Sequence, residues 1–208
     1  MSDKEANWKY ADDLVVEPEV IAIARAHSLE LGIDPVPRAV GAQLAVLSAT
    51  ARAASIIEIG TGTGVSGLWL LQGAPTATLT TIDTESDHHT AARQAFLDAG
   101  YGKGKVRLIA GKALDVLPRM NEESYDLVHI DADSDNVIEY LEHGLRLVRT
   151  GGLVLISGAL GHGEVANPAK RTALARNFRT LLDTVSDSAA VLSALSPAGD
   201  GLLQLVRR

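Results

Sequence analysis

The chain has 208 residues, of which 46% are hydrophobic, and its formal net charge at pH 7 is -7. It contains no cysteine, which excludes disulfides, thiolate nucleophiles and zinc-thiolate sites. The acidic balance, without a basic run, argues against nucleic acid as a partner and favours a small-molecule ligand. The length suits one domain over residues 1–208, with N-terminal helices in residues 1–54 and a cofactor-binding α/β core in residues 55–208.

The N-terminal segment, residues 1–13, is polar and has no apolar signal core. No other stretch approaches the ~20 apolar residues that a membrane span needs. We therefore expect a cytoplasmic protein that does not contact a membrane.

Two helices are predicted ahead of the first strand. Proline in the first turn places the first helix after Glu17, with Gly32 as its end, and apolar residues recurring on one face predict the second over residues 37–54. Strand-like runs then alternate with helical patterns, which predicts a parallel sheet with helices on both faces. The predicted strands are residues 55–60, 77–82, 105–109, 125–130 and 152–157, and the predicted helices are residues 66–72, 88–99, 113–120 and 136–148.

The end of the chain follows a different pattern. A predicted helix at residues 168–186 is followed by two strand-like runs, residues 190–195 and 202–207, joined by a short turn of Pro, Gly and Asp. Two strands joined in this way form a hairpin, so the last strand should be antiparallel to its neighbour. The predicted fold class is therefore α/β, with a Rossmann-like, doubly wound, mostly parallel sheet and a C-terminal antiparallel hairpin strand.

The most informative motif is an apolar run, residues 56–59, that ends in the glycine-dense turn of residues 60–64. Glycine lets the backbone turn sharply and lets a ligand lie against it. A second apolar run ends at Asp83, whose two oxygens can accept hydrogen bonds from the two hydroxyls of a ribose. This pattern is typical of α/β sheets that bind a ribose-containing cofactor at their carboxyl edge.

Two cofactor classes fit this pattern. A nicotinamide dinucleotide needs G-x-G-x-x-G directly after the strand, and in the register that begins at Gly60 the third glycine is replaced by Val65. A later register, Gly62-Thr63-Gly64-Val65-Ser66-Gly67, matches the letters but would require the strand to continue into the turn.

S-adenosylmethionine carries a sulfonium cation and no pyrophosphate, so its site favours carboxylates beside a glycine turn. Glu58, Asp83 and Asp131 supply carboxylates, each at or near the end of an apolar run. The second cofactor class therefore explains more residues than the first.

The order and spacing of these motifs resemble the class I S-adenosylmethionine-dependent O-methyltransferases, and specifically the catechol and caffeoyl-CoA O-methyltransferase family in its bacterial members. The resemblance implies methyl transfer from S-adenosyl-L-methionine to a small hydroxylated, aromatic acceptor, with S-adenosyl-L-homocysteine as the product, and it implies a homodimer. The segments that carry it are residues 58–66, 81–83, 111–114, 125–133, 151–152 and 197–201.

The resemblance also implies site residues. Asp131 would lie where cofactor and acceptor meet and would be catalytic, Asp83 would bind the ribose, and Ala113 would lie near the adenine. The implied cofactor-binding residues are Val36, Glu58, Gly60, Thr61, Gly62, Ser66, Asp83, Ala113, Asp131 and Asp133.

The chain departs from the family where a metal would bind. In the metal-dependent members the counterpart of Asp131 is joined by an Asp-Asn pair, and the matching residues here are Ser157 and Gly158. Magnesium and similar hard cations need several oxygen ligands, which this pair does not supply. We therefore expect no divalent metal of the usual kind. A lysine of the family is also replaced, by Ser134.

The histidines receive different interpretations. His162 lies between two glycines and is a candidate general base, because histidine titrates near neutral pH, although an exposed loop residue without a role is the alternative. His129 lies inside an apolar strand and is expected to be a hydrogen-bonded core residue. His88 and His89 are adjacent at a helix start, lack metal-ligand spacing and are expected at the surface.

The leading functional prediction is an O-methyltransferase that works without the usual divalent metal. One alternative is a cofactor-binding protein of the same fold whose activity has decayed, which the substitutions at Ser157 and Gly158 allow. The other is an NAD(P)-dependent oxidoreductase that uses the register beginning at Gly62.

Overall fold

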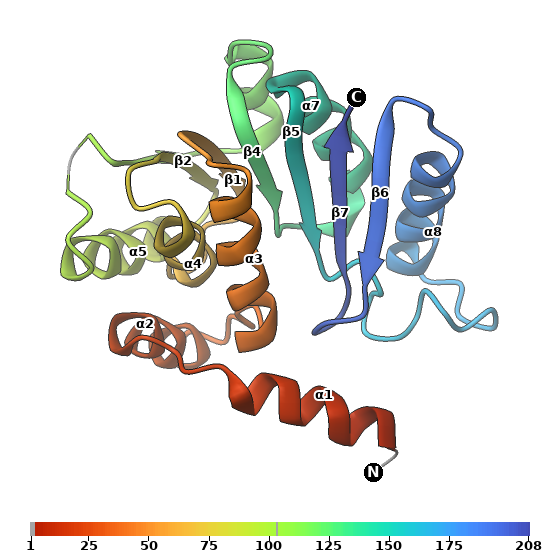
Figure 1. Ribbon diagram of the computed structural model, residues 1–208, viewed down its shortest axis with the longest axis horizontal. Coiled ribbons are helices and arrows are strands. Elements are labelled where there is room, and N and C mark those ends of the chain that lie inside the picture. The colour runs from red at the N-terminus through yellow and green to blue at the C-terminus, as the bar shows by residue number, and fades with distance from the viewer. Residues whose placement is uncertain (1–2, 103) are drawn as a thin grey trace.

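The computed structural model describes residues 3–102 and 104–208. It contains a seven-stranded sheet of order β3-β2-β1-β4-β5-β7-β6 (Figure 1). β1 to β5 pair in parallel, and β7 runs antiparallel to both β5 and β6, so the predicted fold class is confirmed. The strands are β1 (Ser55–Ile59), β2 (Thr78–Asp83), β3 (Val106–Ala110), β4 (Tyr125–Ile130), β5 (Val148–Ser157), β6 (Val191–Ser196) and β7 (Leu202–Arg207).

Helices cover both faces of the sheet, and each face has its own buried core. One core joins the sheet to helices α2 to α5, and the other joins it to α6, α7 and α8. None of the described helices is both long and apolar enough to cross a membrane. The helices are α1 (Asp3–Leu14), α2 (Glu19–Glu30), α3 (Arg38–Thr50), α4 (Val65–Gly73), α5 (Ser86–Asp98), α6 (Ala113–Val116), α7 (Val137–Leu147) and α8 (Ala173–Ser186), with 3-10 turns η1 (Leu117–Arg119) and η2 (Ser134–Asn136).

Helix α1 was not predicted, because its sequence is polar and lacks an apolar stripe. It lies at the edge of the molecule, next to α3 (Figure 1). The carboxylate of Asp12 accepts a hydrogen bond from the backbone amide of Ala39 at 2.8 Å, in the first turn of α3, where amides have no partner inside their own helix. A long-range capping contact thus holds a helix that its own sequence pattern does not predict.

The ends of two other elements differ from the prediction. Helix α8 begins at Ala173 and not near residue 168, because the Thr172 side chain accepts a hydrogen bond from the amide of Ala175 and caps the helix there. Strand β5 begins at Val148, four residues early, because Val148 pairs with Tyr125 ahead of a register shift.

The alternation of β1 decides which side chains reach which core. Ile57 and Ile59 pack into the core under α6 to α8, whereas Ile56 packs into the core under α2 to α5. Because successive side chains of a strand point to opposite faces, Glu58 points to the same face as Ile56. The Glu58 carboxylate is therefore buried in the core that the sheet forms with α2 to α5, at 0% exposure.

Candidate functional site

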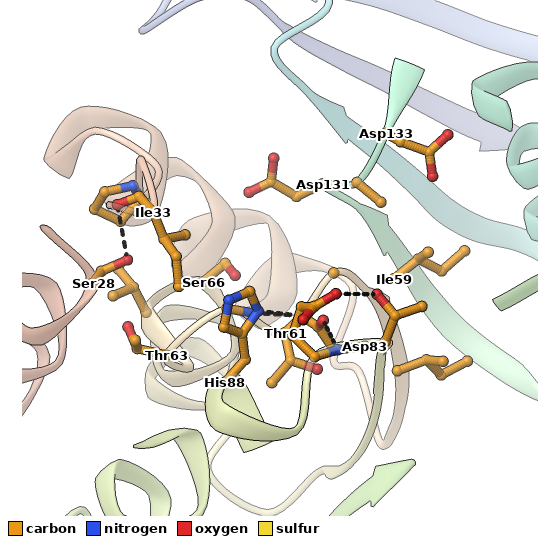
Figure 2. Close-up of a pocket in the computed structure, with 18 of the residues that line it drawn as sticks. Ser28, Ile33, Ile59, Thr61, Thr63, Ser66, Asp83, His88, Asp131 and Asp133 are labelled. Atoms are coloured by element: carbon orange, nitrogen blue, oxygen red, sulfur yellow. Dashed lines mark hydrogen bonds and ion pairs between the residues drawn. The ribbon is translucent and has the colours of Figure 1, made fainter. Parts of the chain in front are cut away.

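A cleft of about 320 Å³ lies at the carboxyl ends of β1, β2 and β4 (Figure 2). Its volume falls in the range of about 300–1,000 Å³ that is usual for small-molecule sites. Strands β2 and β3 extend the sheet to one side of β1, and β4 and β5 extend it to the other. The cleft therefore lies at the switch point where doubly wound sheets bind their ligands.

The turn after β1 requires glycine. Gly60 has φ of 92°, and a Cβ built there would lie 1.9 Å from the backbone oxygen of Asp131. Gly64 has φ of 90° at the N-terminus of α4, and a side chain there would meet Phe96 at 3.3 Å. The turn consequently lies close against the segment after β4 and presents its backbone to the cleft.

Asp83, at the end of β2, is tied to this turn by hydrogen bonds. Its Oδ2 accepts from the amides of Thr61 at 3.0 Å and Gly62 at 2.9 Å, and its Oδ1 accepts from the amide of Glu85 at 3.0 Å. Burial raises the pKa of Asp83, but the amides of Glu85 and Gly62, together with His88, outweigh burial and hold the pKa below its ordinary value. Oδ1 retains one acceptor site, because a carboxylate has about four in all.

His88 and His89 do not lie where the sequence predicted. Nδ1 of His88 is 3.3 Å from Oδ2 of Asp83, and the ring lines the cleft (Figure 2). His89 is buried, with Nε2 at 3.2 Å from the carbonyl oxygen of Asp83. The surface prediction was wrong for His89, and His88 is only partly exposed, with 24% of its side chain accessible, because the first turn of α5 folds back over the end of β2.

Glu58 is the one predicted cofactor residue that does not line the cleft. Its Oε1 accepts a hydrogen bond from Oγ of Ser66, and its Oε2 accepts one from Oγ1 of Thr81, each at 2.7 Å. A fully buried side chain has no surface to offer a ligand, so the expectation of direct contact is corrected. Glu58 instead fixes the rotamer of Ser66, which does line the cleft.

The structure brings the other predicted residues together. Val36, Gly60, Thr61, Gly62, Ser66, Asp83, Ala113, Asp131 and Asp133 all line the cleft. Sequence reasoning missed further lining residues, which come mainly from the loop between α2 and α3 and from the first turns of α5 and α7. They include Ser28, Ile33, Asp34, Pro35, Thr63, Glu85, His88 and Tyr140.

Tyr140 shows why such residues escape a sequence pattern. Its Oη donates a hydrogen bond to Oδ2 of Asp133 at 2.6 Å, and burial together with this bond raises the pKa of Tyr140. In the sequence Tyr140 fits the apolar face of α7, and nothing marks its hydroxyl as part of a site. Asp133 also accepts hydrogen bonds from the backbone and side chain of Asn136, so this carboxylate is held in place on the cleft wall.

A second cavity of about 290 Å³ adjoins the cleft. Apolar side chains from α3 and α8, including Val40, Leu174 and Phe178, form part of its lining. The residues that line both spaces, and so stand between them, are Asp34, Pro35, Val36, Asp131 and Ala132. Asp131 therefore lies between the two spaces.

The pKa of Asp131 lies above its ordinary value. Burial raises the pKa of Asp131, and the neighbouring carboxylates of Glu58 and Asp34 add to this effect while His129 opposes it. A carboxyl with a raised pKa is better suited to share a proton than an ordinary aspartate is. Figure 2 shows Asp131 and Asp133 on the segment that follows β4, across the cleft from Asp83 and His88.

His162 lines the second cavity at its mouth. Its side chain is 77% exposed, and Nδ1 lies 3.7 Å from Oδ2 of Asp200. The backbone of His162 has φ of 53°, and its amide donates a hydrogen bond to the same Asp200 oxygen at 2.6 Å. The residue is thus near the site, with a ring that faces solvent.

His129 is the buried, hydrogen-bonded histidine that its place in an apolar strand predicted. It is 0% exposed, and Nε2 lies 2.9 Å from Oγ of Ser157. The same contact occupies Ser157, which matches a metal ligand of the family, while Gly158 has no side chain to offer. Within residues 3–102 and 104–208, no three His, Asp or Glu side chains are grouped so that they could hold a metal ion. The donor set does not fit the family's metal.

Comparison with known proteins agrees with this geometry. The O-methyltransferase family model matches residues 17–208, and a Mycobacteroides abscessus protein assigned as an O-methyltransferase is 40% identical over 99% of this chain and 96% of its own length. The chain therefore belongs to the O-methyltransferase family, whose class is the S-adenosylmethionine-dependent methyltransferases with this doubly wound fold.

Two solved structures are similar over nearly the whole chain. A Corynebacterium glutamicum protein superposes with a TM-score of 0.91 at 27% identity, covering 99% of this chain and 97% of its own. The second is the O-methyltransferase TomG from Streptomyces achromogenes, which is involved in tomaymycin synthesis and was solved in complex with S-adenosylmethionine. It superposes with a TM-score of 0.86 at 26% identity, covering 100% of this chain and 99% of its own.

Proposed function

We propose that this methyltransferase binds S-adenosyl-L-methionine in the cleft and transfers its methyl group to a small, hydroxylated, aromatic acceptor in the adjoining cavity, without the family's usual divalent metal. The observation that carries the proposal is the shared wall: Asp131 lines both spaces. A transfer reaction needs its two substrates side by side, because holding them in the reactive geometry can remove about 7–11 kcal/mol of the barrier.

The cleft residues fit the cofactor. Oδ1 of Asp83 has the free acceptor site that a ribose hydroxyl needs, and the glycine turn presents backbone to the ligand. Asp131 and Asp133 place negative charge on the opposite wall, where a sulfonium would be attracted. When bound, the cofactor supplies an electrophilic methyl group on that sulfonium.

The second cavity fits an acceptor with an apolar body and a polar edge. Leu174 and Phe178 provide apolar and aromatic surface, and Asp131 provides a hydrogen-bond acceptor at the wall toward the cleft. A hydroxyl bound to Asp131 would therefore face the methyl donor. We propose Asp131 as the catalytic residue that orients the hydroxyl. His162, at the cavity mouth, is the alternative candidate for a general base, and its substitution tests that role.

Titration calorimetry and a transfer assay test the proposal together. We expect S-adenosylhomocysteine to bind equally in chelator and in magnesium, NAD not to bind, and methyl groups to pass to a panel of phenols. Binding without transfer would favour the decayed cofactor-binding protein. Heat only with NAD would favour the oxidoreductase, and transfer that requires magnesium would overturn metal independence.

We also propose that residues 1–208 act as one methyltransferase domain and that the protein is a homodimer. Apolar side chains are exposed on α1 and on β6, which ends the sheet: Trp8 is 50% exposed, Leu14 69% and Leu192 54%. Edge strands and contiguous apolar patches are common at interfaces between protein chains. Light scattering coupled to size-exclusion chromatography measures the mass directly, and a monomer would contradict the dimer.

A further inference from the structure

A chain of polar contacts runs beneath the acceptor cavity, across three adjacent strands. Nε2 of His129 lies 2.9 Å from Oγ of Ser157, and Nδ1 of His129 lies 3.5 Å from Oε1 of Glu58. These residues belong to β4, β5 and β1, and Glu58 and His129 are paired in register. The contacts therefore follow from the strand order and do not depend on a loop.

The three side chains differ in their access to the cavity. Glu58 and His129 are 0% exposed, whereas Ser157 is 9% exposed and lines the acceptor cavity. Nδ1 of His129 has no hydrogen-bond partner among the described residues, and the Glu58 carboxylate faces it. Buried polar groups without partners are costly, so an incompletely satisfied imidazole between a hydroxyl and a carboxylate calls for a functional explanation.

We propose that Ser157 and His129 form a proton relay for the acceptor hydroxyl, with the Glu58 carboxylate as the counter-ion. This inference rests on the proposed O-methyl transfer. A hydroxyl, an imidazole and a carboxylate stand in the same order as in a Ser-His-acid triad. Here the serine oxygen accepts the proton of the acceptor and does not act as a nucleophile.

The step balances in atoms and charge. The acceptor oxygen forms its bond to the methyl carbon while the bond between that carbon and sulfur breaks, and the electron pair of the broken bond stays on sulfur. The acceptor proton passes to Oγ of Ser157 as the serine proton passes to Nε2 of His129. The positive charge lost from sulfur is thus regained on the imidazole, facing Glu58. After product release the proton returns through Ser157 to water in the cavity.

The relay also accounts for the departure from the family pattern. In the metal-dependent members the position of Ser157 carries a carboxylate, and the metal acidifies the acceptor hydroxyl. In this chain the same position carries a hydroxyl that is already hydrogen-bonded to a buried base. The substitution that removes a metal ligand therefore gives the acceptor another route for its proton.

The first test compares Ser157→Ala with the wild-type protein on phenols of decreasing pKa, in chelator. General-base assistance contributes about 10²–10⁴-fold, so kcat should fall by about this factor on weakly acidic phenols. On phenols that are already ionised at the assay pH, kcat should change little. An equal loss on every phenol, or no loss on any, would overturn the relay.

Ser196→Ala is the matched control. Ser196 also pairs with Leu202 at the end of a strand, its Oγ makes a side-chain hydrogen bond to Gln43, and it lines neither cavity of the site. Its removal should leave kcat unchanged on all phenols. Circular dichroism and titration with S-adenosylhomocysteine establish that both variants fold and bind cofactor equally.

The second test needs no variant and no activity. Nitrogen NMR of the full-length protein bound to S-adenosylhomocysteine reports which ring nitrogen of His129 carries the proton. We expect the proton on Nδ1, facing Glu58, with Nε2 free to accept from Ser157. A proton on Nε2 would overturn the relay, because His129 could then not receive one from serine.

The two proposals fail in distinguishable ways. If the wild-type protein methylates no phenol, the proposed acceptor class is rejected, and the tautomer of His129 still decides whether the hydroxyl can pass a proton inward. If the protein methylates phenols but the ratio of wild-type kcat to Ser157→Ala kcat is the same for all of them, the proposed function stands and the relay is rejected.

Discussion

Oδ2 of Asp83 accepts a hydrogen bond from the backbone amide of Gly62 at 2.9 Å, which joins the end of β2 to the turn after β1. The carboxylate that we propose to bind the ribose thus also holds the glycine turn. Asp83→Asn keeps the size of the side chain but loses its charge and one acceptor oxygen. A hydrogen bond to a charged group is worth about 1.5–3 kcal/mol, so S-adenosylhomocysteine should bind ~10–100-fold more weakly by calorimetry.

Asp87→Asn is the control for this variant. Asp87 lies in the first turn of α5, is exposed and does not line the cleft, so its loss should leave the affinity unchanged. Equal weakening in both variants would mean that general charge near α5, and not the strand-end carboxylate, attracts the cofactor.

The lowered pKa of Asp83 predicts acid sensitivity. A carboxyl that ionises more readily when folded contributes stability above the ordinary pKa of 3.8, and this contribution is lost as the pH falls through the folded pKa. The wild-type protein should therefore melt at a higher temperature than Asp83→Asn at pH 6, and the gap should close toward pH 3. Scanning calorimetry between pH 3 and pH 6 measures the difference in melting temperature. A difference that did not change with pH would contradict the lowered pKa of Asp83.

Gly60→Ala should damage both stability and binding. The added Cβ would lie 1.9 Å from the Asp131 backbone oxygen at a residue with φ of 92°, so the turn must move. Strain of this kind costs about 1–3 kcal/mol, which lowers the melting temperature by roughly 2–12 °C in a chain of this size.

Gly102→Ala is the comparison for this substitution, because no atom of the described residues lies within 4 Å of its Cβ position and Gly102 is not among the glycines with positive φ. It should melt close to the wild-type temperature. If Gly60→Ala bound S-adenosylhomocysteine as tightly as this control does, the close approach of the turn would have no part in cofactor binding.

Asp131→Asn should separate activity from stability. Because burial raises the pKa of Asp131, its ionised form opposes folding, and this cost grows as the pH rises through the folded pKa. The variant should therefore become more stable relative to the wild-type protein as the pH rises from 4 to 7. Its kcat should fall by at least ~10²-fold, because the acceptor is no longer oriented by a carboxylate. If the variant instead lost stability relative to the wild-type protein between pH 4 and pH 7, the direction of the pKa shift would be refuted.

His162→Gln distinguishes an exposed loop residue from a base. The ring is 77% exposed and its nearest acidic partner is Asp200, so its loss should alter kcat by no more than about fivefold, the equivalent of ~1 kcal/mol for an exposed pair. A loss of 10²-fold or more, with a changed pH profile, would instead make His162 the proton acceptor.

Much of the fold was predictable, because its signals are local. Apolar runs, helical periodicity and the Pro-Gly-Asp turn predicted the five parallel strands and the closing hairpin, and the strand ends gave Gly60 and Asp83 as neighbours. Helix α1 was missed because a capping contact between Asp12 and Ala39, 27 residues apart, supports it. Propensity is a weak guide where a distant contact decides.

The sequence by itself determined the family, the glycine turn and three of the carboxylates that line the cleft, Asp83, Asp131 and Asp133, because motif spacing along parallel strands fixes which strand ends meet. Only the tertiary structure decided that Glu58 is buried, that His88 faces Asp83 and that Ser157 contacts His129. Such contacts depend on strand register and on which face each side chain takes, and a shift of one residue would reverse that face. No pattern within a single segment contains this information, because the partners lie on strands far apart in the chain.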